Sequence, residues 1–190
     1  MAFEQSKKYC TEVLVITTKG GITFYDDNSR QQTIAFKGFY GAFSDYTTQS
    51  IANINNSYAM TFNTTDESNG VSIVNNSRIT FANAGTYNLQ WSGQFGNTST
   101  GDADAYVWLR KNGVDVVGST GYINVPSKHG TTSGHNLAGW NFVFTVAAND
   151  YYELIWGADS LSVTIDTVAA LSNPTRPSTA SLVLTVTQVR

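Results

Sequence analysis

The chain has 190 residues, of which 13% are charged, and its formal net charge is −3. This length fits one domain with a small appendage, and so few charges leave no broad basic surface for phosphates or anionic lipid. We therefore expect no nucleic-acid partner. The sequence also lacks a signal-peptide-like segment and any apolar run of roughly 18 residues, which predicts synthesis in a cytoplasm without membrane insertion.

Residues 1–40 differ from the rest of the chain in charge. They carry five basic and four acidic groups, whereas residues 41–190 carry six basic and ten acidic groups. We expect two or three short strands there, which cannot form a core alone and need a partner. The sequence thus predicts an attachment segment, 1–40, and a head domain, 41–190. The apolar side chains expected to attach are Val13, Leu14, Val15 and Ile16.

The clearest strand of the head lies at 85–95, in GTYNLQWSGQF. Large apolar side chains and one glycine alternate there with amides and a serine, which at period two places one face inward and the other outward. The residues expected to point inward are Tyr87, Leu89, Trp91, Gly93 and Phe95.

Turn chemistry separates the strands that follow. Asn112-Gly113 stands between two β-rich runs, and because both residues tolerate a positive φ we expect a type I′ hairpin. Residues 147–150 form the next expected turn, and the head closes with the strand SLVLTVTQVR at 181–190. No helical periodicity appears, so the sequence predicts an all-β, antiparallel sandwich or jelly roll.

The segment YYELIW, at 151–156, is apolar in both phases of a strand. Tyr151 and Ile155 share one face, and Tyr152, Leu154 and Trp156 share the other. Two apolar faces need cover on both sides, which favours a second chain, although a loop or sheet curvature within one chain is the alternative. The expected interface residues of a homotrimer are Tyr151, Ile155, Trp156 and Trp108.

Two loop pairs are candidates for metal binding. His129 and His135 lie six residues apart in a glycine-rich loop and could share a metal, although loop histidines are more often solvated. Asp102 and Asp104 have the alternate spacing of calcium ligands, but the other positions of a calcium loop are missing. We expect no metal and no cofactor at either place.

Candidate catalytic groups are few. Cys10 has no histidine nearby in sequence, and no nucleophile motif occurs. Glu153 and Asp166 could form a glycosidase pair only if the fold brought them together. Four Asn-x-Ser/Thr sequons fit an Asn- and Thr-rich composition and are not interpreted as glycosylation sites. They begin at Asn55, Asn63, Asn75 and Asn97.

The order of segments in residues 41–190 resembles the tumour necrosis factor-like jelly roll, shared with the globular head of the complement recognition component. The likeness rests on GAFSDYT, the AGTY turn, VWLRKNGVDVV and the closing SLVLTVTQV. The strings WNFV and LTVTQV are similar to heads of bacteriophage structural proteins, with Gly139 here before Trp140. The resemblance implies a compact homotrimer in which the last strand lies at the subunit contact, and it does not extend to residues 1–40.

Three functions are considered on this basis. The first is a non-enzymatic protein of the virion surface, namely a capsid decoration protein, short head fibre or knob, docked by its N-terminal segment on capsid, tail or fibre proteins. The second is a tail-fibre tip that recognises a host surface glycan or protein through loops 97–105 and 118–138. The third and remotest is a glycan-degrading enzyme.

Overall fold

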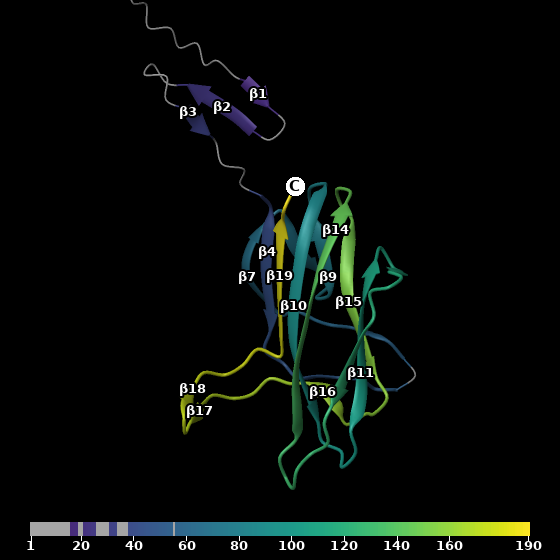
Figure 1. Ribbon diagram of the computed structural model, residues 1–190. Coiled ribbons are helices and arrows are strands. Elements are labelled where there is room, and N and C mark those ends of the chain that lie inside the picture. The colour runs from purple at the N-terminus through teal and green to yellow at the C-terminus, as the bar shows by residue number, and fades with distance from the viewer. Residues whose placement is uncertain (1–15, 19–20, 26–30, 34–37, 55) are drawn as a thin grey trace, which may run out of the picture. The chain divides into compact units, whose positions relative to one another are not determined.

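The computed structural model describes residues 16–18, 21–25, 31–33, 38–54 and 56–190. The chain divides into two compact units, Met1–Lys37 and Gly38–Arg190. Within the described ranges all helical or extended secondary structure is β-strand (Figure 1), which confirms the all-β class.

The first unit contains a three-stranded antiparallel sheet. Its strands are β1 (Ile16–Thr18), β2 (Gly21–Tyr25) and β3 (Gln31–Thr33), in the order β1-β2-β3. Three strands agree with the two or three expected from the sequence. Of the predicted attachment residues, Ile16 is the first residue of β1, and Val13, Leu14 and Val15 lie outside the described residues.

One sheet of the second unit, here the first sheet, is built around a central strand of 13 residues, β10. One edge of β10 pairs with β14 along its whole length, from Gly85↔Val146 to Asn97↔Gly134. The other edge pairs with β19 and then with β16, giving the order β5-β16-β10-β19-β4-β7. The strands are β4 (Tyr40–Asp45), β5 (Gln49–Ser50), β7 (Thr64–Asn69), β10 (Gly85–Asn97), β14 (Gly134–Val146), β16 (Val163–Ile165) and β19 (Leu182–Gln188).

The second sheet has the order β12-β11-β15-β9-β8, with β13 paired to β11 and β6 paired to β15. All of its pairings are antiparallel. Its strands are β6 (Tyr58–Ala59), β8 (Val71–Val74), β9 (Arg78–Phe81), β11 (Ala103–Lys111), β12 (Val114–Asp115), β13 (Gly121–Val125) and β15 (Tyr151–Ala158).

The core lies between these two sheets, in a sandwich-like arrangement. Alternation along β10 is confirmed, because its apolar residues point into the core while Gln90 is exposed. Aromatic rings join the sheets. Phe95 of β10 packs edge-to-face on Trp156 of β15 with ring centroids 6.3 Å apart, and Phe144 of β14 stacks on Tyr152 of β15 at 4.1 Å. Such pairs add to the free energy gained by burying the rings.

The predicted turns are present. Asn112 and Gly113 have φ values of 48° and 84°, and Lys111 pairs with Val114 across them, so the expected two-residue hairpin is confirmed. At 147–150, the Asp150 amide donates to the Ala147 carbonyl at 3.2 Å, and Asn149 has a positive φ of 69°. Both turns use asparagine where a left-handed backbone is required.

Strand β15 is covered on both faces within one chain. Trp156 lies in the core, and Ile155, on the opposite face, is also only 1% exposed. Trp108 pairs opposite Ile155, and the short strand β6 pairs beside it. The expectation that Ile155 and Trp156 need a second chain is therefore corrected, and cover within the chain applies instead.

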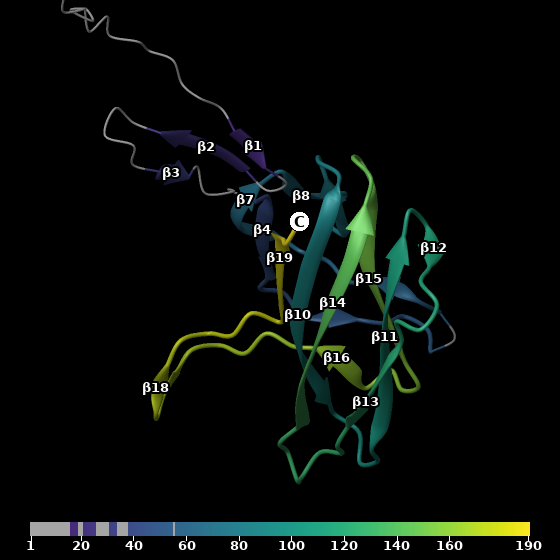
Figure 2. The same cartoon turned by 45° about the horizontal axis from the view of Figure 1, so that its top comes forward.

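A long hairpin projects from the head between β16 and β19 (Figures 1 and 2). Its outer part is the two-stranded sheet β17 (Leu171–Ser172) and β18 (Thr175–Arg176). Nearer the head, Val168 and Thr179 form an isolated antiparallel bridge. We call residues 166–180 the arm.

Candidate functional site

The side of the first sheet that points away from the core carries uncovered apolar side chains. We call this side of β14, β10 and β19 the outer face. Leu137 and Val143 of β14 are each 64% exposed, and Val183 of β19 is 41% exposed. They alternate with inward residues such as Phe142, so the same strand that closes the core leaves large apolar groups in water. An exposed group of this kind is typical of an interaction surface.

The outer face is amphipathic. Between the apolar side chains of β14 and β19 lie the amides and hydroxyl of β10, namely Asn88, Gln90, Ser92 and Gln94, and Thr185 of β19. A hollow of about 600 Å³ lies on this face, and Gln90, Gly139, Val183 and Thr185 are among its lining residues. Apolar contacts with uncharged polar groups between them match the composition of protein interfaces, whose centres are depleted of charged residues.

Trp140 closes the seam between the free edges of the two sheets. Its ring lies over Gly121 of β13, where an added Cβ would come within 2.6 Å of the indole. It also stacks on Phe142 with centroids 5.3 Å apart. The indole nevertheless stays 45% exposed, so it borders the outer face as well.

A second feature is an aromatic hollow of about 630 Å³ on the outward side of the second sheet. Tyr106, Trp108 and Tyr122 line it together with Asp115 and Ile54. Tyr106 and Tyr122 meet edge-to-face at 4.9 Å, and Tyr122 is 78% exposed. Burial, with the Asp159 and Asp104 carboxylates nearby, raises the pKa of Tyr106. Aromatic walls with a few polar groups are typical of small-ligand sites.

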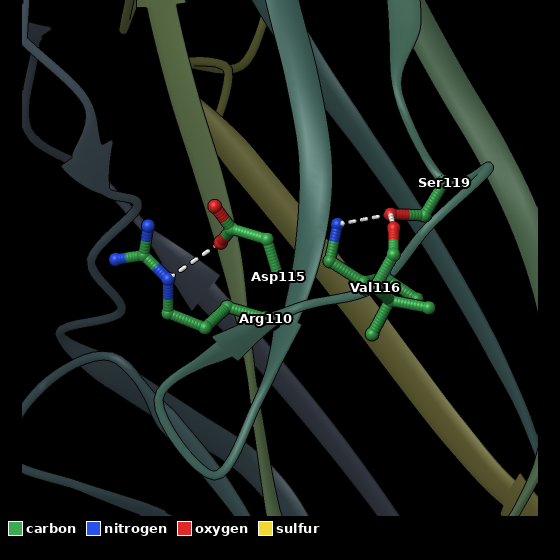
Figure 3. A network of polar contacts seen from close by, with 5 residues as sticks. Arg110, Asp115, Val116 and Ser119 are labelled. Carbon is green, nitrogen blue, oxygen red and sulfur yellow. Dashed lines mark hydrogen bonds and ion pairs between the residues drawn. The ribbon is translucent and has the colours of Figure 1, made fainter.

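The wall of the aromatic hollow that carries Asp115 is held by a polar network (Figure 3). Arg110 Nε donates to Asp115 Oδ1 at 2.7 Å, and the Ser119 hydroxyl accepts from the Leu109 amide at 3.0 Å and donates to the Val116 carbonyl at 2.7 Å. The Arg110 bond, with a smaller effect of the nearby Trp108 indole, lowers the pKa of Asp115. Trp108 Nε1 itself is buried and makes no hydrogen bond of acceptable geometry.

The four predicted interface residues lie on different surfaces. Trp108 lines the aromatic hollow, and Tyr151 is half-buried with Arg78 over its ring at 4.6 Å. Ile155 and Trp156 are buried within the chain. The structure therefore does not bring the four together on one exposed patch.

The two segments expected to be receptor-contacting loops, 97–105 and 118–138, include strand β13 and the starts of β11 and β14, and their remaining parts meet at one end of the head. The Lys128 amide donates to the Ser99 carbonyl at 2.9 Å, and the Ser127 amide donates to Asp102 Oδ1 at 2.8 Å. Asn97, one of the sequon residues, is buried and donates to the carbonyls of Gly101 and Val125 at 2.9 and 3.2 Å. This asparagine therefore fastens the loops together.

Other candidate groups have structural partners. Asp104 Oδ1 accepts from Asn124 at 3.4 Å, and Asp104 is half-buried. His129 forms a tight turn with Thr132 through two backbone hydrogen bonds, whereas His135 is exposed at the start of β14. Within the ranges that the structure describes, no three His, Cys, Asp or Glu residues group closely enough to hold a metal ion.

Glu153 and Asp166 are not brought together. Glu153 lies on β15 of the second sheet and accepts from the Ser77 hydroxyl at 2.6 Å. Asp166 follows β16 of the first sheet, and its backbone amide donates to the Gln94 carbonyl at 2.6 Å. Cys10 lies outside the described residues.

Leu137, Val143 and Val183 were missed when the sequence was read alone. Their signal is visible in LAGWNFVFTV, residues 137–146, where valine and leucine occupy the phase opposite Trp140, Phe142 and Phe144. The same two-phase pattern drew attention to β15, so the pattern alone does not tell which strand remains uncovered.

No protein-family model matches the chain, and no curated protein is significantly similar to it. In the part of the chain that the structure describes, no helix is long and apolar enough to span a membrane.

Proposed function

We propose that the chain is a non-enzymatic protein of a bacteriophage virion surface, whose head is a tumour necrosis factor-like jelly roll that assembles as a homotrimer. The order of strand pairing supports the jelly roll. Along the head, β4 pairs with β19, β9 with β15, β10 with β14 and β11 with β13. The first strand thus pairs with the last, and β9, β10 and β11 each pair with a later strand in reverse order, which is how a folded-over hairpin generates this architecture.

The outer face is the observation that carries the assembly. Leu137, Val143 and Val183 are exposed on a sheet whose other side already forms the core, so nothing else in the described part of the chain covers them. A second and third copy would bury them by symmetry, because a ring of identical subunits closes without leaving a free surface of the same kind. In the proposal this replaces β15 by β14 and β19 as the strands at the subunit contact.

Light scattering of the purified full chain tests the assembly. We expect a particle of three times the 20.6 kDa chain mass at micromolar concentration. The double variant Val143→Asp, Val183→Asp should dissociate it, because the trimer would bury six like charges without partners. Val74→Asp is the matched control, since Val74 is 42% exposed on β8, at the edge of the second sheet. A stable monomer of the unaltered chain would refute the assembly.

The N-terminal unit is assigned the docking role on capsid, tail or fibre proteins, as for a decoration protein, short head fibre or knob. The two compact units support a separable head. A chain of residues 39–190 should fold and assemble yet no longer join the virion, because an added strand such as Val13–Ile16 can bind through main-chain hydrogen bonds to another sheet. If the truncated head decorates particles as well as the full chain, the docking role is wrong.

A second candidate function is recognition of a host surface glycan, and the aromatic hollow favours it. Its volume of about 630 Å³ lies in the range of roughly 300–1,000 Å³ typical of ligand pockets, and Tyr122 offers an exposed ring beside the acceptor Asp115. Host polysaccharide titrated against labelled protein should shift resonances of Tyr106 and Tyr122 first, and Tyr122→Ala should weaken binding at least tenfold. Unchanged binding by this variant would exclude the hollow as the site, and released sugar would point to the remote enzymatic alternative.

A further inference from the structure

The arm, residues 166–180, extends from the head with little support of its own. Residues 169–178 are all exposed, and Leu171 near the tip is 45% exposed. The arm is held internally by the β17–β18 pairs, the bridge between Val168 and Thr179, and a few hydroxyl contacts such as Thr167 Oγ1 to the Thr179 carbonyl at 2.7 Å. A two-stranded hairpin without a covered face is marginally stable in water.

Its root, by contrast, is firmly fixed to β10. The Gln94 amide donates to the Ser181 carbonyl at 2.9 Å, and the Gln94 carbonyl accepts from the Asp166 amide at 2.6 Å. Both limbs of the arm therefore begin at one residue of the central strand. Ser181 is in turn buried and bonded to the Asp45 carbonyl. These hydrogen bonds fix the direction in which the arm leaves the head, although its tip has no support from the head.

The arm borders the outer face. The Asp166 carboxylate occupies the space that a side chain at Gly96 of β10 would need. Gln94 and His135, both on the outer face, enclose a hollow of about 300 Å³ together with arm residues, which include Arg176 and Pro177. The arm and the uncovered part of the sheet thus form two sides of one recess.

The composition of the arm is typical of a segment that contacts another protein rather than of one that stays in water. Its sequence, DTVAALSNPTRPSTA, has seven apolar or proline residues and only two charged ones, Asp166 at the root and Arg176 near the tip. Exposed hairpins are normally protected against pairing with other chains by charged side chains, prolines or very short strands, and this one has Pro174, Pro177 and Arg176 rather than a row of charges. The head from residue 41 onward carries six basic and ten acidic groups, a net charge of −4, which favours a copy of the same head as the surface that receives Arg176.

We propose that the arm clasps a second copy of this chain, with Leu171 and Arg176 seated on the neighbouring head while the outer faces meet. This inference rests on the proposed trimer and adds its locking element. Each subunit gives one arm and receives one, so the contact closes around the three-fold ring.

Removing the arm tests the proposal. Residues 169–178 are replaced by Asn-Gly, which closes the chain across the existing Val168–Thr179 bridge. We expect an unchanged circular dichroism spectrum and a trimer whose dissociation midpoint rises at least 100-fold in concentration. If the full chain is trimeric and the shortened chain is equally stable as a trimer, the arm proposal is overturned while the proposed function stands. If the full chain is itself monomeric, the proposed assembly fails first.

A second measurement applies even if the shortened chain does not fold. A photo-crosslinking residue is placed at Leu171 in trimers mixed from ¹⁴N- and ¹⁵N-labelled full chains. We expect crosslinked peptides that join the arm of one isotope to the head of the other. Crosslinks that stay within one isotope in a mixed trimer would show that the arm folds back on its own head. Leu171→Ser should weaken the trimer, and Val74→Ser, at a similarly exposed valine of β8, should not.

Discussion

Strands β14 and β15 are neighbours in sequence, joined by the turn at 147–150, and both are apolar in two phases, yet their second faces meet different surroundings. Ile155 of β15 is 1% exposed, whereas Val143 of β14 is 64% exposed. The difference arises from what lies beyond each strand. β15 is central in its sheet, where Trp108 and Ala59 flank Ile155 from the two neighbouring strands, while β14 is an edge strand with no layer beyond its outer face in the described chain.

A strand that is apolar on both faces therefore predicts that its second face is covered, but it does not show whether the same chain or another chain covers it. For β15, Ile155 is flanked by Trp108 and Ala59, which come much earlier in the chain and pair with it from the two neighbouring strands. For β14 we assign the cover to other copies. Substitutions on β15 should therefore lower the stability of the folded monomer, whereas substitutions on the outer face of β14 should weaken the proposed trimer.

The largest effect is expected at Trp156, the core residue of β15. It is 1% exposed and packs edge-to-face on Phe95 across the two sheets. Trp156→Ala should lower the free energy of unfolding by about 3–5 kcal/mol, because a cavity remains where the indole was. Urea unfolding measures the loss, and a variant that unfolds at the same urea concentration would contradict the position of Trp156 in the core.

The direct comparison uses Ile155→Ala and Val143→Ala. At a concentration where the chain is monomeric, the first should cost about 2–5 kcal/mol, as for buried Ile, and the second less than about 0.5 kcal/mol, as for a surface site. At higher concentration, where the proposed trimer forms, the loss of stability caused by Val143→Ala should become larger, because this variant weakens the trimer. Equal losses in the monomer would mean that β14 is covered within the chain after all.

A smaller loss is expected at the turn that fixes the start of β15. The Asn112 side chain accepts from the Tyr151 amide at 2.9 Å and donates to Asp150 at 2.8 Å, and Gly113 beside it has a φ of 84°. Gly113→Val should cost about 1–3 kcal/mol, since a β-branched residue is strained in this region. Val114→Ala, at an exposed position of the same hairpin, serves as the control and should unfold like the unaltered chain.

The smallest expected effect is a pH dependence at the β14–β15 turn. Hydrogen bonds from Lys111, Asn112 and the Ala147 amide lower the pKa of Asp150 from 3.8 to about 2. Because the folded-state pKa is depressed, this stabilisation is complete above the unfolded value and is lost as the pH falls from about 4 to about 2. Thermal melting followed across that window should show a slope that Asp150→Asn reduces. An identical slope in the variant would assign the acid sensitivity to other carboxylates.

Local patterns in the sequence were sufficient for the longest strands and for the two turns. The alternation in 85–95 and the Asn112-Gly113 pair act through neighbouring residues, so the inward face of β10 and the two-residue hairpin were both predictable. Which strand keeps an open face depends on sheet order, and pairs such as Leu184 with Phe43 and Trp91 join residues far apart in the chain. Periodicity contains no information about those pairings. The sequence therefore did not predict that Leu137 and Val143 are exposed, and it wrongly predicted Ile155 as an interface residue.

The place of β19 has a consequence for how the head forms on the ribosome. This strand, Leu182–Gln188, lies between β10 and β4 and bonds to both, so the first sheet has a gap until the last residues of the head have been made. Until then β4 and β10 each expose an unpaired edge beside apolar side chains, a state prone to pairing with the wrong chain. The head must therefore complete its folding after residue 188 has been synthesised, and chains that are still incomplete carry an unfinished first sheet.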